Sequence, residues 1–340
     1  MDEILLITLC AVIAGCEGWI DIENFGKAKL EVLQKYLPYK NGTSSDDTLR
    51  RFFRALDPKA FKENFRKWVD GLDGLKKTNT IAIDRKISRR SKDAEQDALH
   101  LVSAFATEAG LVIAQTKMNK KSNKTTAIPE LIEWLDLQGS TITIDAMGCQ
   151  KKIAQLIVEK HGNYVLGLKG NHKNLLEEVQ TFFDGCPDCD RSQTIEKGHG
   201  RIEVRRCFVS EDISWLHQKE MWLGLKSLVM IESKRELKGE NTQERRYYLS
   251  SLPADATKTL KIIRSHWVIE NGVHLVLDMS FGDDASRIRK GNAPENMAIM
   301  KHSALNMIRR YKTKRQSIKG LRKQAGWDEK ILQGILSCVS

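Results

Sequence analysis

The sequence lacks the features that would place the protein in a membrane or in an oxidising compartment. Its apolar run Ile4–Ala14 is too short to span a bilayer, and the acidic residues Asp2 and Glu3 precede it. A signal peptide would carry basic residues there, so we expect a buried first helix instead. The 7 cysteines are scattered along the 340 residues. A reduced cytoplasm is the compartment that fits this pattern best.

The sequence is also poor in recognisable zinc ligands. Cys186 and Cys189 form one C-x-x-C pair, but no second pair lies nearby. A zinc site would need further ligands, and His199 and Cys207 are the candidates. An incidental loop is therefore the favoured interpretation of this pair.

Three acidic residues, far apart in the sequence, stand where two divalent metal ions could be held. Asp84 and Asp145 each end a run of alternating residues, so both are expected at strand ends facing a crevice. Glu270 lies on a largely apolar face of a helical stretch, where a carboxylate is unfavourable unless it is paired or binds a metal. Mg²⁺ and Mn²⁺ prefer such oxygen ligands. A two-metal site of this kind breaks and joins phosphodiester bonds.

The same residues also have structural interpretations. Asp84 and Asp145 could cap a following turn or helix. Glu270 could form an ion pair with Arg264 or His274. The long gaps between the three acids carry little specificity, so pattern and spacing alone leave these alternatives open.

Acidic residues are outnumbered, with 44 Asp and Glu against 55 Lys and Arg, a net charge of +11 and a pI near 9.2. This balance favours a polyanionic partner. The basic residues gather in three groups: Arg85, Lys86, Arg89, Arg90 and Lys92; Lys117, Lys120, Lys121 and Lys124; Arg309, Arg310, Lys312, Lys314, Arg315, Lys319, Arg322 and Lys323. Such groups are often solvated surface. Beside metal-binding carboxylates, however, contacts to phosphates explain them better than contacts to bases.

Residues 1–75 are predicted to form a small all-helical domain. The expected helices are Leu5–Ala14, Asp21–Tyr36, Thr48–Leu56 and Pro58–Val69. Three arginines flank two phenylalanines in the third helix: Arg50, Arg51, Phe52, Phe53 and Arg54. A DNA-binding helix-turn-helix and a plain bundle with solvated arginines explain this pattern equally well.

Residues 76–310 are predicted to form an α/β domain, a mixed sheet flanked by helices. Leu99–Ala106 and Leu111–Lys117 are expected to form a hairpin that pairs with the strand of Asp84. From about residue 193 to 252 the chain becomes strand-like. Residues 311–340 are predicted to be a basic tail.

Distinctive sequence motifs, called words below, lie around the three acids, and several of them are long and unusual. These words are Ile83–Lys86, Lys121–Asn123, Thr126–Leu131, Asp145–Lys151, Tyr164–Asn171, Glu196–Arg201, His266–Asn271 and Arg287–Ala293. In these words the chain resembles the transposases of insertion sequences, and most closely the H-repeat-associated branch linked to Rhs elements. The resemblance runs from about Leu5 to the C-terminus, with the words in the expected order.

The resemblance implies an RNase H-like catalytic domain of the DDE type, with a β-rich insertion or sheet extension at about 193–252. It implies that Asp84, Asp145 and Glu270 bind two Mg²⁺ or Mn²⁺ ions. The expected activity is hydrolysis at transposon ends, followed by transfer of the freed 3′-hydroxyl into target DNA. The expected partners are double-stranded terminal repeats and target DNA, bound by a homodimer because two ends must be held together. The protein would act in the bacterial cytoplasm, at the nucleoid.

Further DNA contacts are expected at Arg85, Lys86, Arg89, Arg90, Lys121, Lys169, His266, Arg287, Arg289 and Lys290. Two positions depart from the family's words: Arg85 stands where members usually have Gly, and Lys124 where they usually have Glu. Gly permits a close backbone approach that Arg does not. Two alternatives therefore stay open: an inactive DNA-binding remnant, and a metal-dependent structure-selective nuclease that cuts without joining.

Overall fold

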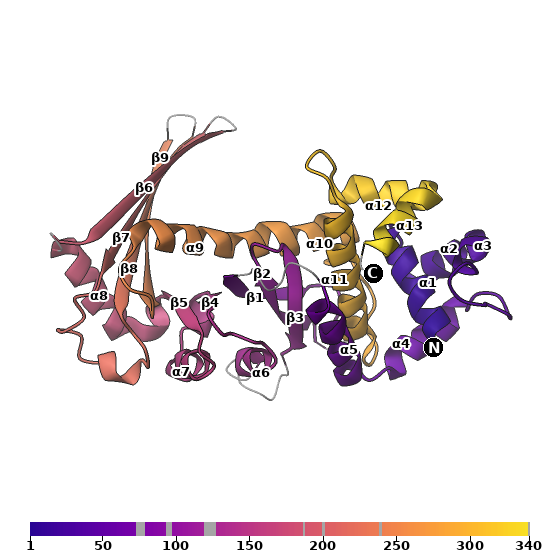
Figure 1. Cartoon of the computed structure of the whole chain (residues 1–340), viewed down its shortest axis with the longest axis horizontal. Coiled ribbons are helices and arrows are strands. Elements are labelled where there is room, and N and C mark those ends of the chain that lie inside the picture. Colours follow the sequence, from indigo (N-terminus) through magenta and orange to yellow (C-terminus); the bar gives the residue numbers. More distant parts are fainter. Residues whose placement is uncertain are drawn as a thin grey trace.

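The protein is described by a computed structural model that covers residues 1–72, 79–92, 97–118, 127–185, 188–198, 201–237 and 240–338. A nine-stranded mixed sheet runs through it, in the order β3-β2-β1-β4-β5-β9-β8-β7-β6 (Figure 1). The strands are β1 (Thr80–Ser88), β2 (Leu99–Ala106), β3 (Leu111–Lys117), β4 (Thr141–Ile144), β5 (Asn163–Leu168), β6 (Asp190–Gly198), β7 (Arg201–Ser210), β8 (Ser227–Leu237) and β9 (Glu240–Ser250). The hairpin expected from the sequence is present as β2 and β3.

The first five strands form the part of the sheet that carries the acids. β1 pairs antiparallel with β2 and parallel with β4, and β4 pairs parallel with β5. Successive side chains of a strand point to opposite faces. Accordingly Ile81 and Ile83 pack into the core on one face of the sheet, while Ala82 packs into the core on the other.

Helices cover both faces of this part. α6 (Ala127–Glu133) and α7 (Lys151–Glu159) lie on one face, and α9 (Ala256–Val268) crosses the other (Figure 1). α9 continues through a π-helical turn, Ile269–His274, into α10 (Leu275–Phe281). One long helix thus connects the strand-rich end of the molecule with its helical end.

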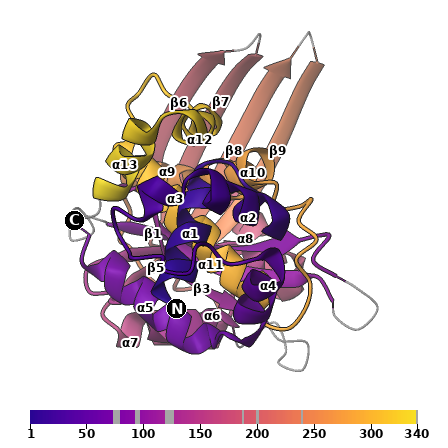
Figure 2. The ribbon, with the colours of Figure 1, turned by 90° about the vertical axis from the view of Figure 1, so that its right-hand side faces the viewer.

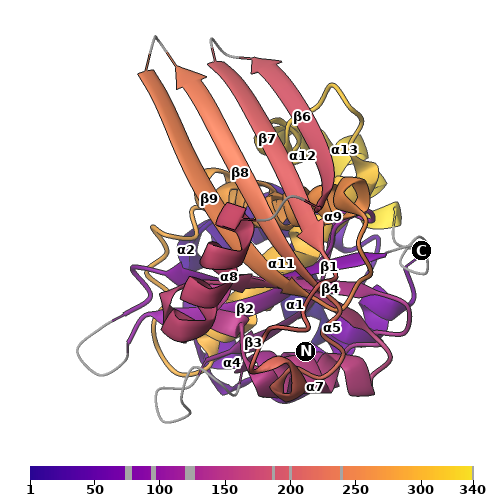
Figure 3. The ribbon, with the colours of Figure 1, turned by 90° about the vertical axis from the view of Figure 1, so that its left-hand side faces the viewer.

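The strand-like segment extends the sheet. β9 pairs antiparallel with β5, and β8, β7 and β6 follow in antiparallel order. Figure 3 shows these four strands running well past the helices, with α8 (Lys173–Gly185) beside them. The sequence indicated strands in this region, although the sequence pattern did not resolve β6 as a separate element.

The N-terminal helices share one core with the C-terminal helices. They are α1 (Asp2–Ile13), α2 (Trp19–Ala28), α3 (Leu30–Leu33), α4 (Asp46–Ala55), α5 (Pro58–Asp70), α11 (Ala293–Tyr311), α12 (Ile318–Trp327) and α13 (Glu329–Ser337). Figure 2, which faces this end, shows them gathered together. The first helix is buried as expected, since Ile7 is 1 % exposed. No helix in the described part of the chain is long and apolar enough to cross a membrane.

Two expectations for this end of the molecule were wrong. The expected helix Asp21–Tyr36 is divided into α2 and α3. The expected basic tail instead forms α12 and α13, whose residues Leu321 and Leu332 lie in the common core. This segment is rich in basic residues, but its apolar residues recur at helical spacing and therefore require a partner surface.

Candidate metal and DNA site

The parallel pairing of β1 and β4 brings Asp84 and Asp145 side by side. Ile83 on β1 is in register with Ile144 on β4, so the next residue of each chain segment is an aspartate. β4 ends at this point, and Asp145 Oδ1 accepts a hydrogen bond of 3.1 Å from the backbone N–H of Met147. β1 continues to Ser88, so Asp84 does not end its strand as the sequence predicted. It lies instead beside the place where the neighbouring strand stops.

Glu270 reaches the same region from the long helix. It is the second residue of the π-helical turn, while its neighbours Ile269 and Val273 are fully buried in the core. A π-turn places one extra residue in the turn and so re-aims the side chains around it, and such turns are frequent at functional sites. The half-buried Glu270 thereby faces the edge of the sheet where the two aspartates lie.

The three carboxylates influence one another's protonation. Burial raises the pKa of Asp84 to about 7; the charges of Asp145 and Glu270 act in the same direction, while the backbone N–H of Arg85 opposes them. Burial also raises the pKa of Glu270, and Asp145 contributes again. The site therefore holds negative charge that the protein itself compensates only in part.

A hard divalent cation fits this donor set, because it would compensate the charge with oxygen ligands. Within the described residues, no group of three or more His, Cys, Asp or Glu side chains is arranged to hold a metal ion as it stands. The acids thus converge on one region without forming a closed cage.

Two histidines border the acids. His266 Nδ1 lies 3.0 Å from Thr143 Oγ1, and its buried Nε2 has no hydrogen-bond partner among the described residues. His274 Nδ1 lies 3.4 Å from Asp84 Oδ2. The sequence raised His274 as a partner for Glu270, but the structure places it against Asp84. Burial, followed by the charge of Lys86, lowers the pKa of His274 to about 4, so the ring is neutral near pH 7.

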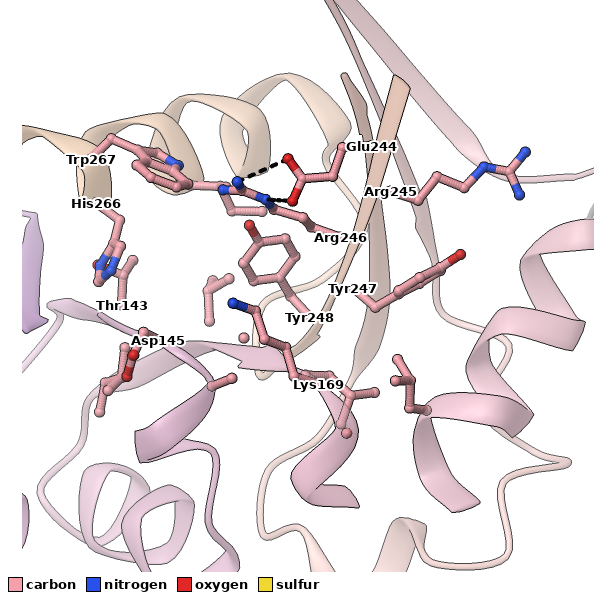
Figure 4. Close-up of a pocket in the computed structure, with 18 of the residues that line it drawn as sticks. Thr143, Asp145, Lys169, Glu244, Arg245, Arg246, Tyr247, Tyr248, His266 and Trp267 are labelled. Atoms are coloured by element: carbon pink, nitrogen blue, oxygen red, sulfur yellow. Dashed lines mark hydrogen bonds and ion pairs between the residues drawn. The ribbon is translucent and has the colours of Figure 1, made fainter. Parts of the chain in front are cut away.

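A cavity of about 430 Å³ opens beside the acids (Figure 4). Asp145, Glu270 and His266 are among the residues that line it. Lys169 and Arg246 contribute positive charges to the same lining, and Figure 4 shows the Lys169 ammonium directed into the space. The cavity therefore combines carboxylates and cations.

The turn that follows β4 shapes this cavity. A side chain at Gly167 would place its Cβ 3.1 Å from the backbone N of Ala146, a tight contact that would press on the turn after Asp145. Asn171 Nδ2 donates a 2.9 Å hydrogen bond to the Ala146 carbonyl. Both residues stand in the word Tyr164–Asn171, but no role was predicted for either of them from the sequence.

Arg85 and Lys86 take different places from those the sequence predicted. Arg85 follows Asp84 on a strand, so its side chain points to the opposite face of the sheet from the carboxylate. Lys86 is buried, and its ammonium lies 2.5 Å from Asp278, 3.3 Å from Asp284 and 3.4 Å from Asp283. Three carboxylates surround the charge of Lys86, which gives the expected DNA contact at this residue no support.

Other residues of the first basic group come together with the word Arg287–Ala293. Arg289 Nε donates a 3.0 Å hydrogen bond to the Arg90 carbonyl, and Arg89 lies 3.4 Å from Asp284. Arg89, Arg90, Arg287 and Lys290 are exposed, and Arg89 largely so. The fold thus brings Arg289 against Arg90, and DNA contact by these residues stays a prediction. Lys120, Lys121 and Lys124 lie outside the described residues.

The third basic group is partly structural. Arg309 donates hydrogen bonds to the carbonyls of Gly110 and Gly272, and Arg322 donates two to the carbonyl of Val12. Both guanidinium groups are deep in the fold, where burial lowers the pKa of each to about 10. These two arginines therefore stabilise the fold, and phosphate contact by other members of the group stays a prediction.

Two of the three arginines of α4 form ion pairs within the protein. Arg50 lies 2.5 Å from Asp46, and Arg51 lies 3.1 Å from Asp47, each one helical turn away. These pairs reduce the positive charge available to DNA, so the helix-turn-helix interpretation gains no support from them. The suggested C-x-x-C site involves Cys186 and His199, which lie outside the described residues.

The chain matches known protein families and relatives along nearly its whole length. A family model described as "Transposase DDE domain" matches residues 75–307, and a second, "DDE_Tnp_1-associated", matches residues 1–69. "Putative transposase YncI" of Escherichia coli O157:H7 is 41 % identical over 100 % of this chain and 90 % of its own length. "H repeat-associated putative transposase YhhI" of Escherichia coli K12 is 37 % identical over 99 % and 92 %.

Among solved structures, the chain is distantly similar to a transposase. A cryo-EM structure of the piggyBac transposase synaptic complex with hairpin DNA aligns at 11 % identity and a TM-score of 0.45. The alignment covers 99 % of this chain and 70 % of that one. A likeness this low says nothing about the geometry of the site.

Proposed function

The chain belongs to the DDE transposase family, and we propose that it cuts insertion-sequence ends by metal-dependent hydrolysis and joins the freed 3′-hydroxyl to target DNA. The observation that carries this proposal is the convergence of Asp84, Asp145 and Glu270 from two parallel strands and a crossing helix. An RNase H-like arrangement of β1–β5 is part of the proposal, supported by the order β3-β2-β1-β4-β5 with β1–β2 antiparallel.

The chemistry follows from the donor set. Two Mg²⁺ or Mn²⁺ ions held between Asp84, Asp145 and Glu270 would activate the attacking water or 3′-hydroxyl and stabilise the departing oxygen. The carboxylates act as ligands and form no covalent bond with DNA. His274 and the Arg85 backbone N–H orient Asp84, while the turn at Met147 orients Asp145. Both aspartates are thus held by a second contact, as metal ligands usually are.

The proposed partner is double-stranded DNA, both as terminal repeats and as target. Lys169 and Arg246 line the cavity beside the acids, and the exposed Arg89 and Arg90 follow the end of β1. Such groups position a phosphate backbone without reading its sequence. A homodimer on DNA is part of the proposal, because two ends must be held together for joining.

Arg85 does not favour the inactive-remnant alternative. Its side chain points away from Asp84, so it does not fill the space between the three acids. Its positive charge also acts to lower the pKa of Asp84, which favours the ionised carboxylate that a metal needs. Loss of the family's usual Gly at this position is therefore compatible with activity.

The test is cleavage of a labelled duplex that carries the terminal repeat flanking the gene, with Mg²⁺ or Mn²⁺. We expect strand-specific nicking at the repeat for the wild type and for Glu220→Gln, an exposed control outside the site. Glu270→Gln should abolish it. Cutting without joining would support the nuclease alternative, whereas metal-independent binding without cutting would support the remnant.

A further inference from the structure

Successive side chains of β9 face two different helices, α8 and α9. Arg245 and Tyr247 face α8, where Arg245 Nη1 lies 2.7 Å from Asp184 and Tyr247 packs against Phe183. Glu244, Arg246 and Tyr248 face α9 instead (Figure 4). The alternation of a strand thus sends two neighbouring arginines to opposite sides.

Arg246 is held over the cavity by two contacts. Its guanidinium carbon lies 4.3 Å from the centre of the Trp267 ring, which belongs to the same long helix as Glu270. Its Nε and Nη2 donate hydrogen bonds of 2.7 and 3.0 Å to the two carboxylate oxygens of Glu244. A planar guanidinium stacked on an aromatic ring presents its donors in a fixed plane, which suits bidentate binding of phosphate.

The position of Arg246 relative to the acids suits a substrate phosphate. It lines the same cavity as Asp145 and Glu270, and Lys169 adds a second cation there. The charge of Arg246 reaches Glu270, because it acts to lower the pKa that burial raises. A DNA strand whose scissile bond lies at the acids would bring a neighbouring phosphate within reach of these two cations.

We propose that Arg246, which lies on β9 in the β6–β9 part of the sheet, binds a phosphate of the DNA strand next to the scissile bond. Glu244 holds the Arg246 side chain in place until DNA binds. This inference rests on the proposed function, because it takes the same DNA as ligand. The Glu244 side chain is 59 % exposed. Ion pairs at such exposed positions are weak, so a phosphate in the cavity can replace the carboxylate.

The experiment measures affinity for a labelled duplex carrying the terminal repeat, at several salt concentrations and with Ca²⁺ in place of Mg²⁺. Each phosphate of B-DNA that a protein neutralises adds about 0.9 to the steepness with which log K falls against log salt. We expect Arg246→Gln to bind about tenfold more weakly and to lower this slope by about one unit. Arg246→Lys should keep the slope, because it keeps the charge, but lose the bidentate geometry and part of the affinity.

Two neighbours serve as matched variants. Arg245→Gln removes the adjacent arginine, which also borders the cavity but whose guanidinium is directed to Asp184 of α8 (Figure 4), so it should lower the slope less than Arg246→Gln does. Glu244→Gln removes the competing carboxylate and should raise affinity by up to about fivefold. Thermal unfolding checks that each variant is folded; if Arg246→Gln does not fold, Arg246→Lys and Glu244→Gln decide by affinity.

The outcomes separate this inference from the proposed function. An Arg246→Gln slope equal to the wild type, or an equal decrease in Arg245→Gln, overturns the role of Arg246 while cleavage by the wild type still stands. A wild type that binds DNA but never cuts it overturns the proposed function, yet the slopes still decide on Arg246. A wild type that binds no DNA refutes both.

Discussion

Replacing Lys86 by Met should destabilise the protein far more than removal of a surface lysine. The Lys86 side chain is 7 % exposed and contacts Asp278, Asp283 and Asp284, while Lys301 lies 2.8 Å from Asp283. Without Lys86, Asp283 keeps its pair with Lys301 and Asp284 its pair with the exposed Arg89, but the buried cation that contacts all three carboxylates is lost. Removing one partner of a buried pair typically costs about 3–5 kcal/mol in the free energy of unfolding. Met is about as long as Lys but carries no charge, so the decrease in stability measures the loss of the Lys86 charge.

The assay is urea unfolding of the wild type, Lys86→Met and a surface control, Lys27→Met. Lys27 pairs with Glu23 while 64 % of its side chain is exposed, so its replacement should cost at most about 1 kcal/mol. The double variant Lys86→Met with Asp278→Asn should recover part of the lost stability. A Lys86→Met variant within about 1 kcal/mol of the wild type would show that this cluster does not stabilise the fold in the way proposed.

The pH dependence gives a second check on this cluster. Burial alone would raise the pKa of Asp283, but the charges of Lys301 and Lys86 hold it well below its usual range. A depressed pKa stabilises the fold above the unfolded value, about 4, and this contribution is lost as the pH falls further. The difference between the wild type and Lys86→Met should therefore shrink as the pH falls through about 4. A difference that grows in acid would contradict this assignment.

Three further predictions concern the site and the core. Gly167→Ala should lower the cleavage rate at least about tenfold with little loss of stability, because its Cβ would press on the turn after Asp145; equal rates for both proteins would count against this contact. Arg85→Gly should change the cleavage rate less than about threefold, since Arg85 faces away from Asp84; a large gain would revive the remnant interpretation. Burial lowers the pKa of His302 to about 3, so the unfolded chain takes up a proton below about pH 6.5 that the folded one does not. Wild-type stability should fall by about 1–3 kcal/mol from this group between about pH 6.5 and 4.5, and His302→Gln should lose less, as measured by urea unfolding.

The sequence predicted the parts of the fold that local patterns encode. The hairpin of β2 and β3 and the strand before Asp145 followed from alternating residues, and the family's words pointed to Asp84, Asp145 and Glu270. Register could not be read in this way. Only the pairing of Ile83 with Ile144 shows why two aspartates that are far apart in sequence become neighbours.

The sequence could not separate buried charges from solvated ones. Lys86, Arg309 and Arg322 stand in basic runs, and each proved to be held inside the fold by carboxylates or carbonyl oxygens. Their partners are distant in the chain, so no local signal exists for them. Arg246 was missed for a similar reason: its strand was predicted, but its place over Trp267 depends on how β9 packs against α9.

Binding of Mn²⁺ to the protein–DNA complex, followed by electron paramagnetic resonance, tests the proposed metal site most directly. We expect two ions per site in the wild type, and we expect Asp84→Asn, Asp145→Asn and Glu270→Gln each to weaken this binding by at least about tenfold. Glu220→Gln should bind as the wild type does. Binding that is unchanged in all three site variants would contradict the claim that these carboxylates share the metal ions.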